Sequence, residues 1–598
     1  MLQLTIDGQR VNLTPDCSLE IVKANPFLTK TGEYTFDIDV DLRDPQNAKV
    51  YRHIDRFHSL YHPEGRTAML MDGARVICKG VEVLLETDGT TAKIQILAGN
   101  SVLNYLTGSE TDKVRDMDFG TMPVVTVTEA IEISKKTFPD ANFTFPVVKF
   151  VADDGSVKYA NDGLHLLGAT PDSYTPPLKG QPFLLYYIEK LVSLLGYTME
   201  YNCLAEDERW KRLIIVDSDF SLEYARHLPD WTVAEFINEV EKFFNCIFLL
   251  DTLHGRVSIV QSKDYYQDNS HVEIIGREDL IDEFSRTFAA EGLDAVDADN
   301  VSYNLPDREY YKYANLDDEI EELCSIVPID TADIGIIKAT ASDFIIYEGG
   351  DGSLHFIFDK DGKRQNGDAV KLYRQVNQFK SVRKDDKQPM LSLNIIPAEI
   401  ELAYDVCPVS PYAEYGYTRC VSRNVYEEVA VQNLKDMISS GIQTENVGKT
   451  MEVCFCLGMT LGRKLTGLDS SGYEAYNIDC YEGAEDCPTV PVTTVWYHLG
   501  QAVMGVNQIF SYTMEECGGI EPLTLSLDGD DGRVRTDFSS LSFDASEEYS
   551  IRFRTHKMLD PMHLYNIDNR LFYCKELRYH IENGELGNIV EGKLFPAI

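Results

Sequence analysis

The nearest approach to a nucleotide-binding motif in this sequence is the segment from Gly441 to Thr450, which ends in Gly448-Lys449-Thr450. A phosphate-binding loop also needs a glycine five residues before the glycine of that ending, because its backbone N–H groups curve closely around the phosphate. Position 443 is a glutamine. In addition, Met451 to Leu457 has the apolar pattern of a strand, where a phosphate-binding loop leads into a helix. We therefore expect no nucleotide to bind here.

Three histidines lie close together in the sequence, and two of them have a metal-binding spacing. His58 and His62 are four residues apart, as on one face of a helix, with His53 and Glu64 nearby. A zinc protease carries a glutamate base directly after the first histidine of such a pair, and Ser59 stands there instead. The pattern therefore favours surface or interfacial histidines at a helix end.

The acidic, glycine-rich run from Asp528 to Gly532 has the composition of a calcium-binding loop. An EF-hand loop needs a bidentate glutamate at its twelfth position, and Ser539 occupies it, so we interpret the run as a tight hairpin turn. Any of the 97 acidic residues could supply paired carboxylates for glycoside cleavage, and the sequence does not locate such a pair. Motifs of serine, zinc-dependent and papain-like hydrolases are absent. We predict no catalytic, metal-binding or cofactor-binding residues.

The thirteen cysteines are scattered, without the spacing of a disulfide scaffold. Cys454 and Cys456 are expected on one face of a strand, and Cys480 with Cys487 is the other close pair. The sequence has no Cys-x-x-Cys pair, which speaks against a closed zinc site. We therefore predict reduced thiols in a protein that is assembled in the cytoplasm.

The chain is strongly acidic: 55 basic against 97 acidic residues give a net charge of −42. This charge argues against binding nucleic acid through its phosphates. Residues 273–322 alone hold 16 acidic and 4 basic residues. They form either a solvated acidic surface or the wall of a channel along which DNA slides without sticking, because like charge lowers affinity for phosphate. The sequence leaves both interpretations open.

The 33 tyrosines include the pairs at 186–187, 265–266 and 310–311. Tyrosine combines an apolar ring with a polar tip, so these residues suit partly wet interfaces and suit sugar binding equally well. No apolar run approaches the roughly 18 residues of a membrane span. Met1 to Leu13 has the pattern of a hairpin turning at Asp7-Gly8 and lacks the layout of a signal peptide, so we expect no export by an ordinary route.

The local pattern predicts several elements directly. Residues 34–42 alternate as a half-buried strand, with Tyr34, Phe36, Ile38, Val40 and Leu42 on one face. Asp44 followed by Pro45 starts a helix, and hairpins turn at Asp72-Gly73, Asp88-Gly89 and Asn583-Gly584. Helices are predicted from Pro182 to about Gly196 and after the capping box of Thr232 and Glu235, followed by a hairpin of 246–251 with 257–261.

These elements predict an α+β, multi-domain fold in which β-barrel-like domains are combined with small α/β domains. We expect a first β-barrel-like domain at 1–120, an α/β domain at 121–225 and a helix–hairpin unit at 226–270 that completes the first half. The second half is expected to hold a second β-barrel-like domain at 271–410, a loop-rich insertion or peripheral domain at 411–520 and a C-terminal β domain at 521–598.

The segment from Asn25 to Gly80, with its strand, its Asp44-Pro45 helix and its paired strands, resembles the opening of the hub proteins at the tip of bacteriophage tails, especially the Bacteroidetes-phage type. The helix start at Asp230-Trp231-Thr232 and the closing strands from Asn569 to Phe595 resemble the same family. The resemblance covers residues 1 to about 270 and the last 60 or so. Residues 410–520 depart from the minimal family pattern.

The resemblance implies a non-enzymatic virion protein without a cofactor: a baseplate hub at the tail tip with tail-tube-like domains, usually a trimer around a DNA ejection channel. The implied partners are tail-tube and distal tail proteins, the tape-measure protein, and tail spikes or fibres. DNA would pass the channel without specific binding. An alternative is a secreted or surface glycan-binding β-protein, or a polysaccharide-degrading enzyme, of a gut bacterium. Tyr-rich loops and an acidic surface would suit the glycan-binding protein.

Overall fold

The computed structural model describes the two ends of the chain and shorter segments between them. At the N-terminal end it describes residues 2–288, apart from gaps at 15–16, 62, 64, 109–111, 152–156, 162–163, 165–176, 218, 267–270 and 282–283. At the C-terminal end it describes residues 547–597 apart from 583. Between these ends the described segments are 300–306, 311, 327–328, 344–348, 354–358, 372–373, 379, 381–382, 390–406, 414–422, 449–459, 489–492, 523–527 and 543.

The largest unit is a sheet of 14 strands built from both ends of the chain. Its main path runs β18-β30-β33-β32-β3-β4-β8-β7-β6-β1-β2, with β5 beside β8, and β17 beside β31, which pairs with β32. The strands are β1 (Leu2–Ile6), β2 (Gln9–Val11), β3 (Leu19–Ala24), β4 (Glu33–Thr35), β5 (Ile38–Asp41), β6 (Arg66–Asp72), β7 (Arg75–Thr87), β8 (Thr91–Ala98), β17 (Val272–Ile275), β18 (Ser285–Phe288), β30 (Glu547–Arg554), β31 (Leu564–Ile567), β32 (Arg570–Glu582) and β33 (Glu585–Pro596).

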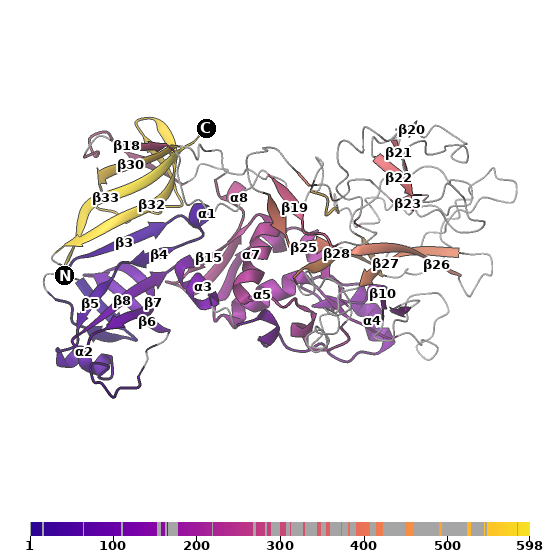
Figure 1. Cartoon of the computed structure of the whole chain (residues 1–598), viewed down its shortest axis with the longest axis horizontal. Coiled ribbons are helices and arrows are strands. Elements are labelled where there is room, and N and C mark those ends of the chain that lie inside the picture. The colour runs from indigo at the N-terminus through magenta and orange to yellow at the C-terminus, as the bar shows by residue number, and fades with distance from the viewer. Residues whose placement is uncertain are drawn as a thin grey trace, which may run out of the picture.

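The antiparallel pair β3–β32 joins the two ends of the chain in this sheet, with Leu19 opposite Ile581 and Ala24 opposite Glu576. Side chains from both ends share one core, in which Ile21, Leu577 and Tyr579 are fully or almost fully buried. The division by sequence places these strands in separate domains, 1–120 and 521–598. In the structure they form one continuous sheet, seen in indigo and yellow at one end of the molecule (Figure 1).

The short turns of this sheet follow the sequence. The strands predicted around Asp7-Gly8, Asp72-Gly73 and Asp88-Gly89 pair as hairpins, and so do β32 and β33 on either side of position 583. Gly73 and Gly89 have φ of 61° and 83°, a left-handed conformation that glycine adopts without steric cost. Asp44 accepts hydrogen bonds from Gln46 N and Asn47 N and so caps α2 (Pro45–Val50), as predicted.

The prediction of a single strand at 34–42 is wrong in one respect. The structure divides it into β4 and β5, and both pair with β8. The buried face changes at the break, because Thr35 and Ile38 are buried while Phe36 is exposed. There the Thr35 hydroxyl accepts a hydrogen bond from Ile96 N at 2.9 Å, so a side chain takes the place of a main-chain acceptor and allows the change of register.

A helical layer follows the sheet and carries the second core. Helix α7 begins with the predicted capping box, in which Thr232 accepts from Glu235 N and Glu235 accepts from Thr232 N, and it ends at Asn245 in a left-handed conformation. Helix α5, predicted from Pro182 to about Gly196, buries Leu184, Tyr187, Ile188 and Leu191 along one face. The helices are α1 (Pro26–Thr29), α2, α3 (Asn100–Thr107), α4 (Val127–Ser134), α5 (Leu184–Leu194), α6 (Cys203–Glu206), α7 (Val233–Phe244) and α8 (Ser262–Tyr266), with 3-10 turns η1 (Val114–Asp116), η2 (Trp210–Arg212) and η3 (Tyr224–His227).

Smaller sheets lie around these helices. The described pairings are β13-β16-β15, β14-β28-β25 with β29 beside β28, β11-β10-β27-β26, β12-β9, β19-β24 and β20-β21-β22-β23. Their bounds are β9 (Phe143–Thr144), β10 (Val148–Val151), β11 (Val157–Ala160), β12 (Gln181–Pro182), β13 (Thr198–Asn202), β14 (Leu213–Ile215), β15 (Ile247–Asp251), β16 (Arg256–Val260), β19 (Val301–Tyr303), β20 (Val327–Pro328), β21 (Phe344–Glu348), β22 (Leu354–Phe358), β23 (Leu372–Tyr373), β24 (Leu391–Leu393), β25 (Ile395–Pro397), β26 (Glu399–Val406), β27 (Glu414–Ser422), β28 (Met451–Met459) and β29 (Thr489–Val492).

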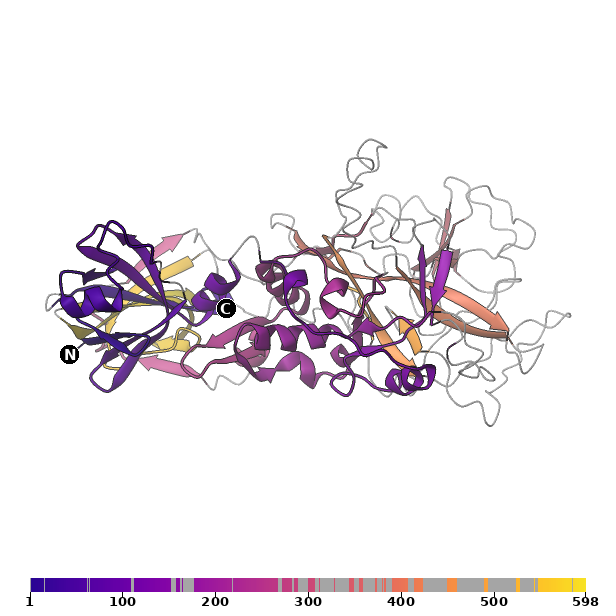
Figure 2. The same cartoon turned by 90° about the horizontal axis from the view of Figure 1, so that it is seen from below.

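Strand β28 is central in its sheet, although its residues belong to the segment 411–520 that the sequence assigns to an insertion or peripheral domain. It pairs antiparallel with β14 and parallel with β25, and its side chains from Met451 to Leu457 are buried in the second core. Helices α5 and α7 lie in the middle of the molecule, between the large sheet and β26–β27 (Figures 1 and 2).

Direct contacts connect the large sheet with the helical layer. Asn100 of α3 donates to Phe248 O at 2.7 Å and accepts from Leu250 N at 3.0 Å, which binds the end of β8 to β15. Lys30 Nζ donates to Asn238 Oδ1 of α7 at 2.6 Å. The architecture is therefore α+β with several sheets, as predicted, and the strand pairings among the described residues form open sheets and no closed barrel.

Candidate functional site

A buried cluster of Tyr51, Arg66 and Glu82 fastens the end of α2 to the large sheet. The Tyr51 hydroxyl donates to Glu82 Oε1 at 2.5 Å, and Arg66 Nε donates to Glu82 Oε2 at 2.6 Å. The Arg66 guanidinium lies 4.5 Å from the Tyr51 ring centroid, and its Nη1 donates to Val50 O. Burial raises the pKa of Glu82, against the opposing effect of its Tyr51 and Arg66 bonds. The cluster makes a rigid base for the chain that leaves α2.

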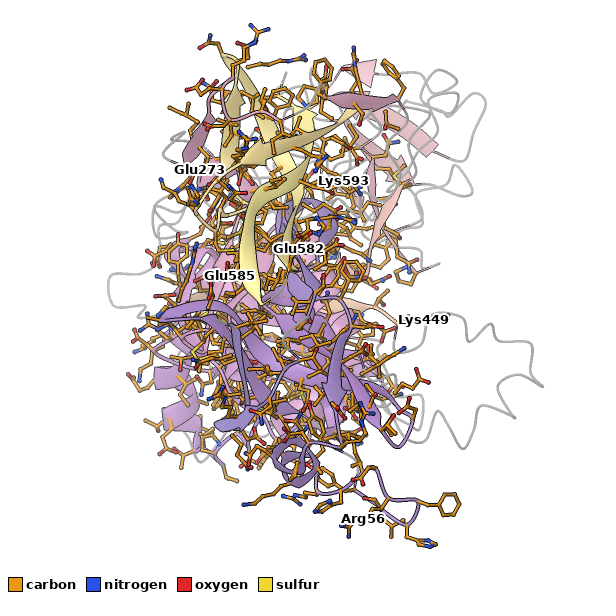
Figure 3. All side chains as sticks on the ribbon, turned by 90° about the vertical axis from the view of Figure 1, so that its left-hand side faces the viewer. Arg56, Glu273, Lys449, Glu582, Glu585 and Lys593 are labelled. Carbon is orange, nitrogen blue, oxygen red and sulfur yellow. The ribbon has the colours of Figure 1, made fainter. Side chains whose placement is uncertain are left out.

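From this base a loop at residues 52–61, here called the apolar loop, projects from the sheet. Arg52 and His53 have positive φ of 47° and 57°, and the Arg52 guanidinium lies over the Tyr61 ring at 4.7 Å from its centroid. At its tip Phe57 is 98% and Leu60 99% exposed. Figure 3 shows Arg56 on this loop, away from the strands of the sheet. The sequence pattern predicts a helix end with surface histidines here and misses the exposed apolar tip.

A second buried ionic cluster lies in the helical layer. Lys179 Nζ is 3.0 Å from Asp217 Oδ1, and His227 Nδ1 is 2.7 Å from Asp217 Oδ2. All three side chains are at most 1% exposed. Despite burial, which alone raises it, the pKa of Asp217 is lowered by the neighbouring His227 and Lys179 charges and their hydrogen bonds.

Both ring nitrogens of His227 face acceptors. Nδ1 faces the Asp217 carboxylate, and Nε2 lies 3.0 Å from the Ser221 carbonyl oxygen. Because a carbonyl oxygen accepts and cannot donate, this arrangement requires the doubly protonated imidazolium form. Lys179 also donates to Asp219 O. The cluster therefore joins the segment before β12, the segment after β14, and η3.

The cysteines of β27 and β28 form a third buried group. Cys420 Sγ lies 3.6 Å from Cys454 Sγ, and the pair Cys454 and Cys456 occupies one buried face of β28, as predicted. Burial raises the pKa of Cys454 well above its ordinary value and that of Cys456 to about 12. Such thiols stay protonated and are poor nucleophiles. Cys480 and Cys487 lie outside the described residues.

The other motifs are partly described. The strand predicted after Thr450 is confirmed as β28, and the rest of the phosphate-loop-like segment lies outside the described residues apart from Lys449 and Thr450. His58 is exposed, whereas His62, Glu64 and the run 528–532 are not described. Within the described ranges no three or more His, Cys, Asp or Glu side chains gather to hold a metal ion. No helix in those ranges is long and apolar enough to cross a membrane.

Several of the predicted interface tyrosines belong to the cores. Tyr187 is fully buried and donates to Tyr224 O at 2.8 Å, and Tyr311 is buried and donates to Pro397 O at 2.7 Å. Tyr266 is buried as well and accepts from Asn25. Tyr186 and Tyr265 are half-buried, and Tyr310 is not described. For the buried tyrosines the interface and sugar-binding interpretations are wrong, because their hydroxyl groups already have partners inside the protein.

The described residues also form an open cavity of about 430 Å³ beside α6 and α8, which the sequence did not indicate. Glu206, Glu208 and Asp264 line it together with Trp210. Arg209 also lines it, and its guanidinium lies 5.0 Å from the centroid of the Trp210 ring and pairs with Asp207. The cavity is acidic and polar; Cys203 also lines it, and burial together with the charge of Asp264 raises the pKa of this thiol to about 12.

The solved structures that are similar to this chain include two tail proteins. A 43 kDa tail protein of prophage MuSo2 from Shewanella oneidensis is 7% identical, with a TM-score of 0.30 over 99% of this chain and 96% of that chain. A tail protein from Neisseria meningitidis MC58 is also 7% identical, with a TM-score of 0.28 over 99% of this chain and 95% of that chain. No protein-family model and no curated protein matches the chain. At these TM-scores the two likenesses carry no argument about function.

Proposed function

We propose that this chain is a structural protein of a bacteriophage tail, which forms the hub at the distal end of the tail and organises the baseplate around a DNA channel. It would act as a homo-oligomer, a trimer, in contact with tail-tube and distal tail proteins, the tape-measure protein, and spikes or fibres. It would be assembled in the host cytoplasm and end in the virion. We propose no catalysis and no cofactor.

The observation that carries this proposal is the union of the two chain ends in one sheet. Two of the stretches that resemble hub proteins, the opening one and the closing one, lie at opposite ends of the sequence, and in the structure β3 before the opening stretch's Asn25 pairs with β32 of the closing stretch. Asn25, the first residue of the family-like opening, donates through Nδ2 to Cys574 O at 2.9 Å and to Pro561 O at 3.1 Å. A resemblance split between two distant segments therefore corresponds to one structural unit.

The described polar clusters support a structural role. Tyr51–Arg66–Glu82 and Lys179–Asp217–His227 are buried, and their charged groups are paired within the chain. Such clusters fix the relative positions of segments and offer no surface to a substrate. The net charge of −42 agrees with a wall along which DNA passes without binding.

Immuno-electron microscopy of virions produced from the genome that encodes the chain tests the location. We expect antibodies against the purified chain to label the distal end of the tail. Label on the capsid, or none on particles whose tails are intact and accessible, would contradict the proposal. An assay for release of sugar from cell-wall glycan and other polysaccharides tests the absence of catalysis, and activity that disappears when two facing acids are changed to amides would contradict it.

A further inference from the structure

Two buried thiols meet at the boundary between two sheets. Cys420 lies on β27, in the sheet β11-β10-β27-β26, and Cys454 lies on β28, in the sheet β14-β28-β25 (Figure 1). Among the described residues these two sheets share no strand pairing. The two Sγ atoms are nevertheless 3.6 Å apart, and both residues are completely buried. A single covalent bond at this contact would therefore join the two sheets.

The main chain holds both cysteines in place. Cys420 N donates to Val147 O at 3.0 Å, and Cys420 lies opposite Val148 of β10. Cys454 lies opposite Ile214 of β14. Because each strand is paired within its own sheet, the sulfur atoms are kept near each other without further ordering. A disulfide bond is about 2.05 Å long, so the sulfur atoms must approach by about 1.5 Å, which rotation of the two side chains can supply.

The third thiol of this group, Cys456, is a poorer partner for Cys454. The two residues are two positions apart on one face of β28, which separates their Cα atoms by about 6.6 Å in a regular strand. A bridge between them would close a ring across a single residue and distort the strand. Cys456 Sγ lies instead 4.0 Å from Thr144 Oγ1 of β9.

The surroundings of the pair restrict its chemistry. Burial raises the pKa of Cys454 well above its ordinary value, so little thiolate forms, and bulky reagents have no access to it. No three metal-ligating side chains gather among the described residues, so a metal site does not compete for these thiols. A small peroxide that enters the core converts one thiol into a sulfenic acid. The neighbouring thiol is then in contact with the oxidised sulfur.

We propose that Cys420 and Cys454 form a disulfide bond when the chain meets a peroxide, and that this bond fastens the sheet of β27 to the sheet of β28. In the first step one sulfur attacks the peroxide, the O–O bond breaks, and water leaves with the proton of the thiol. In the second step the other sulfur attacks the sulfenic acid, the S–S bond forms, and the hydroxyl group leaves as water. The two thiols thus lose two electrons, which reduce one hydrogen peroxide to two water molecules.

This cross-link goes beyond the proposed function. A protein assembled in the cytoplasm keeps its thiols reduced, whereas disulfides persist in the oxidising surroundings outside a cell. For a tail protein the bond would form after the particle leaves its host. The chemistry itself depends only on the contact between Cys420 and Cys454, so its failure would leave the proposed function untouched.

The test is peptide mapping of the purified full chain after oxidation under native conditions. The reduced chain is treated with hydrogen peroxide, its remaining thiols are alkylated during denaturation, and it is digested without reductant. We expect peptides joined through Cys420 and Cys454, at least about tenfold more abundant than any other cysteine pair, because contact raises the effective concentration of the two thiols. Dithiothreitol added before alkylation should abolish the link. Cys78 and Cys574 are buried as well, and as internal controls they should be recovered as alkylated thiols.

A second measurement controls for access of the peroxide to the core. The oxidation is repeated in urea below the unfolding transition, where local opening admits the oxidant while the circular dichroism spectrum is unchanged. Recovery of Cys420 and Cys454 as alkylated thiols under both conditions overturns the proposal. A predominant link of either residue to Cys456 overturns it as well.

Thermal unfolding tests whether the bond fastens the sheets. The midpoint of the oxidised wild type should exceed that of the reduced wild type by at least about 2 °C, because the bond constrains the unfolded segment 420–454. Cys420→Ala should show no such rise. Cys456→Ala is the matched control on the same face of β28, and it should keep both the linked peptides and the rise. Linked peptides without a rise in the wild type would contradict the fastening of the two sheets.

Discussion

The side-chain amide of Asn25 lies 2.9 Å from the carbonyl oxygen of Cys574, and this hydrogen bond joins the beginning and the end of the chain. Asn25 is completely buried. Its Nδ2 also lies 3.1 Å from Pro561 O and 3.1 Å from the Tyr266 hydroxyl, while its Oδ1 accepts from Phe27 N and caps α1. One residue at the end of β3 is thus bonded to α8, to β32 and to the segment before β31, and it adds to the pairing of β3 with β32.

Asn25→Asp should destabilise the protein more than Asn25→Ala. The alanine leaves backbone groups without their partner, at a cost of about 1–3 kcal/mol. The aspartate keeps the cap to Phe27 N but turns an acceptor toward the carbonyl oxygens of Pro561 and Cys574, which repel it. Denaturant unfolding monitored by circular dichroism measures the stability of both variants and of the wild type. Equal stability of Asn25→Asp and wild type would show that the amide does not hold the two ends together.

Asp217→Asn should destabilise the protein by about 3–5 kcal/mol near neutral pH, because it leaves the buried charges of Lys179 and His227 without a counter-charge. The free energy of unfolding, measured in denaturant at several pH values, gives the result. Asp39→Asn is the control, since Asp39 is exposed on β5, and it should change stability little.

The same carboxylate predicts a pH dependence. The folded pKa of Asp217 is lowered, so its contribution to stability is present above the unfolded pKa of about 3.9 and disappears as the pH falls through the folded pKa. In wild type the stability should therefore decline through this acid range, and part of that decline should be missing in Asp217→Asn. Identical pH profiles of the two proteins would contradict the assignment.

The buried thiols should resist alkylation in the native protein. Because burial raises the pKa of Cys456 to about 12 and that of Cys454 well above its ordinary value, little thiolate forms near neutral pH and reagent has no access. Peptide mass spectrometry after iodoacetamide treatment should find Cys420, Cys454 and Cys456 unmodified in the native chain and modified after denaturation. Rapid labelling of all three in the native chain would contradict the burial of Cys420 on β27 and of Cys454 and Cys456 on β28.

Local features were predictable because they depend on neighbouring residues. The Asp-Gly turns, the Asp44 cap and the Thr232–Glu235 capping box are all formed as the sequence indicates. The β3–β32 pairing was not predicted, because periodicity shows which face of a strand is buried but not which distant strand lies beside it. The break in the strand at Phe36 was not predicted for a related reason. The Thr35 side chain replaces a backbone acceptor there, and the alternation of apolar and polar residues does not show such a replacement.

The candidate sites were harder to predict than the fold. Lys179, Asp217 and His227 are separated in sequence, and nothing about each residue alone indicates a buried ion cluster. The tyrosine pairs suggest surface positions because each side chain has a polar tip, yet Tyr187 and Tyr266 are buried in the cores. Phe57 and Leu60 fit the apolar periodicity of a helix, and only the structure shows that they leave the surface.

The absolute mass of the purified chain in solution, determined by light scattering across a range of protein concentrations, tests the central claim most directly. A homotrimeric hub predicts three times 67.6 kDa, about 203 kDa, at the higher concentrations. A mass of 67.6 kDa at every concentration would contradict a self-assembling hub.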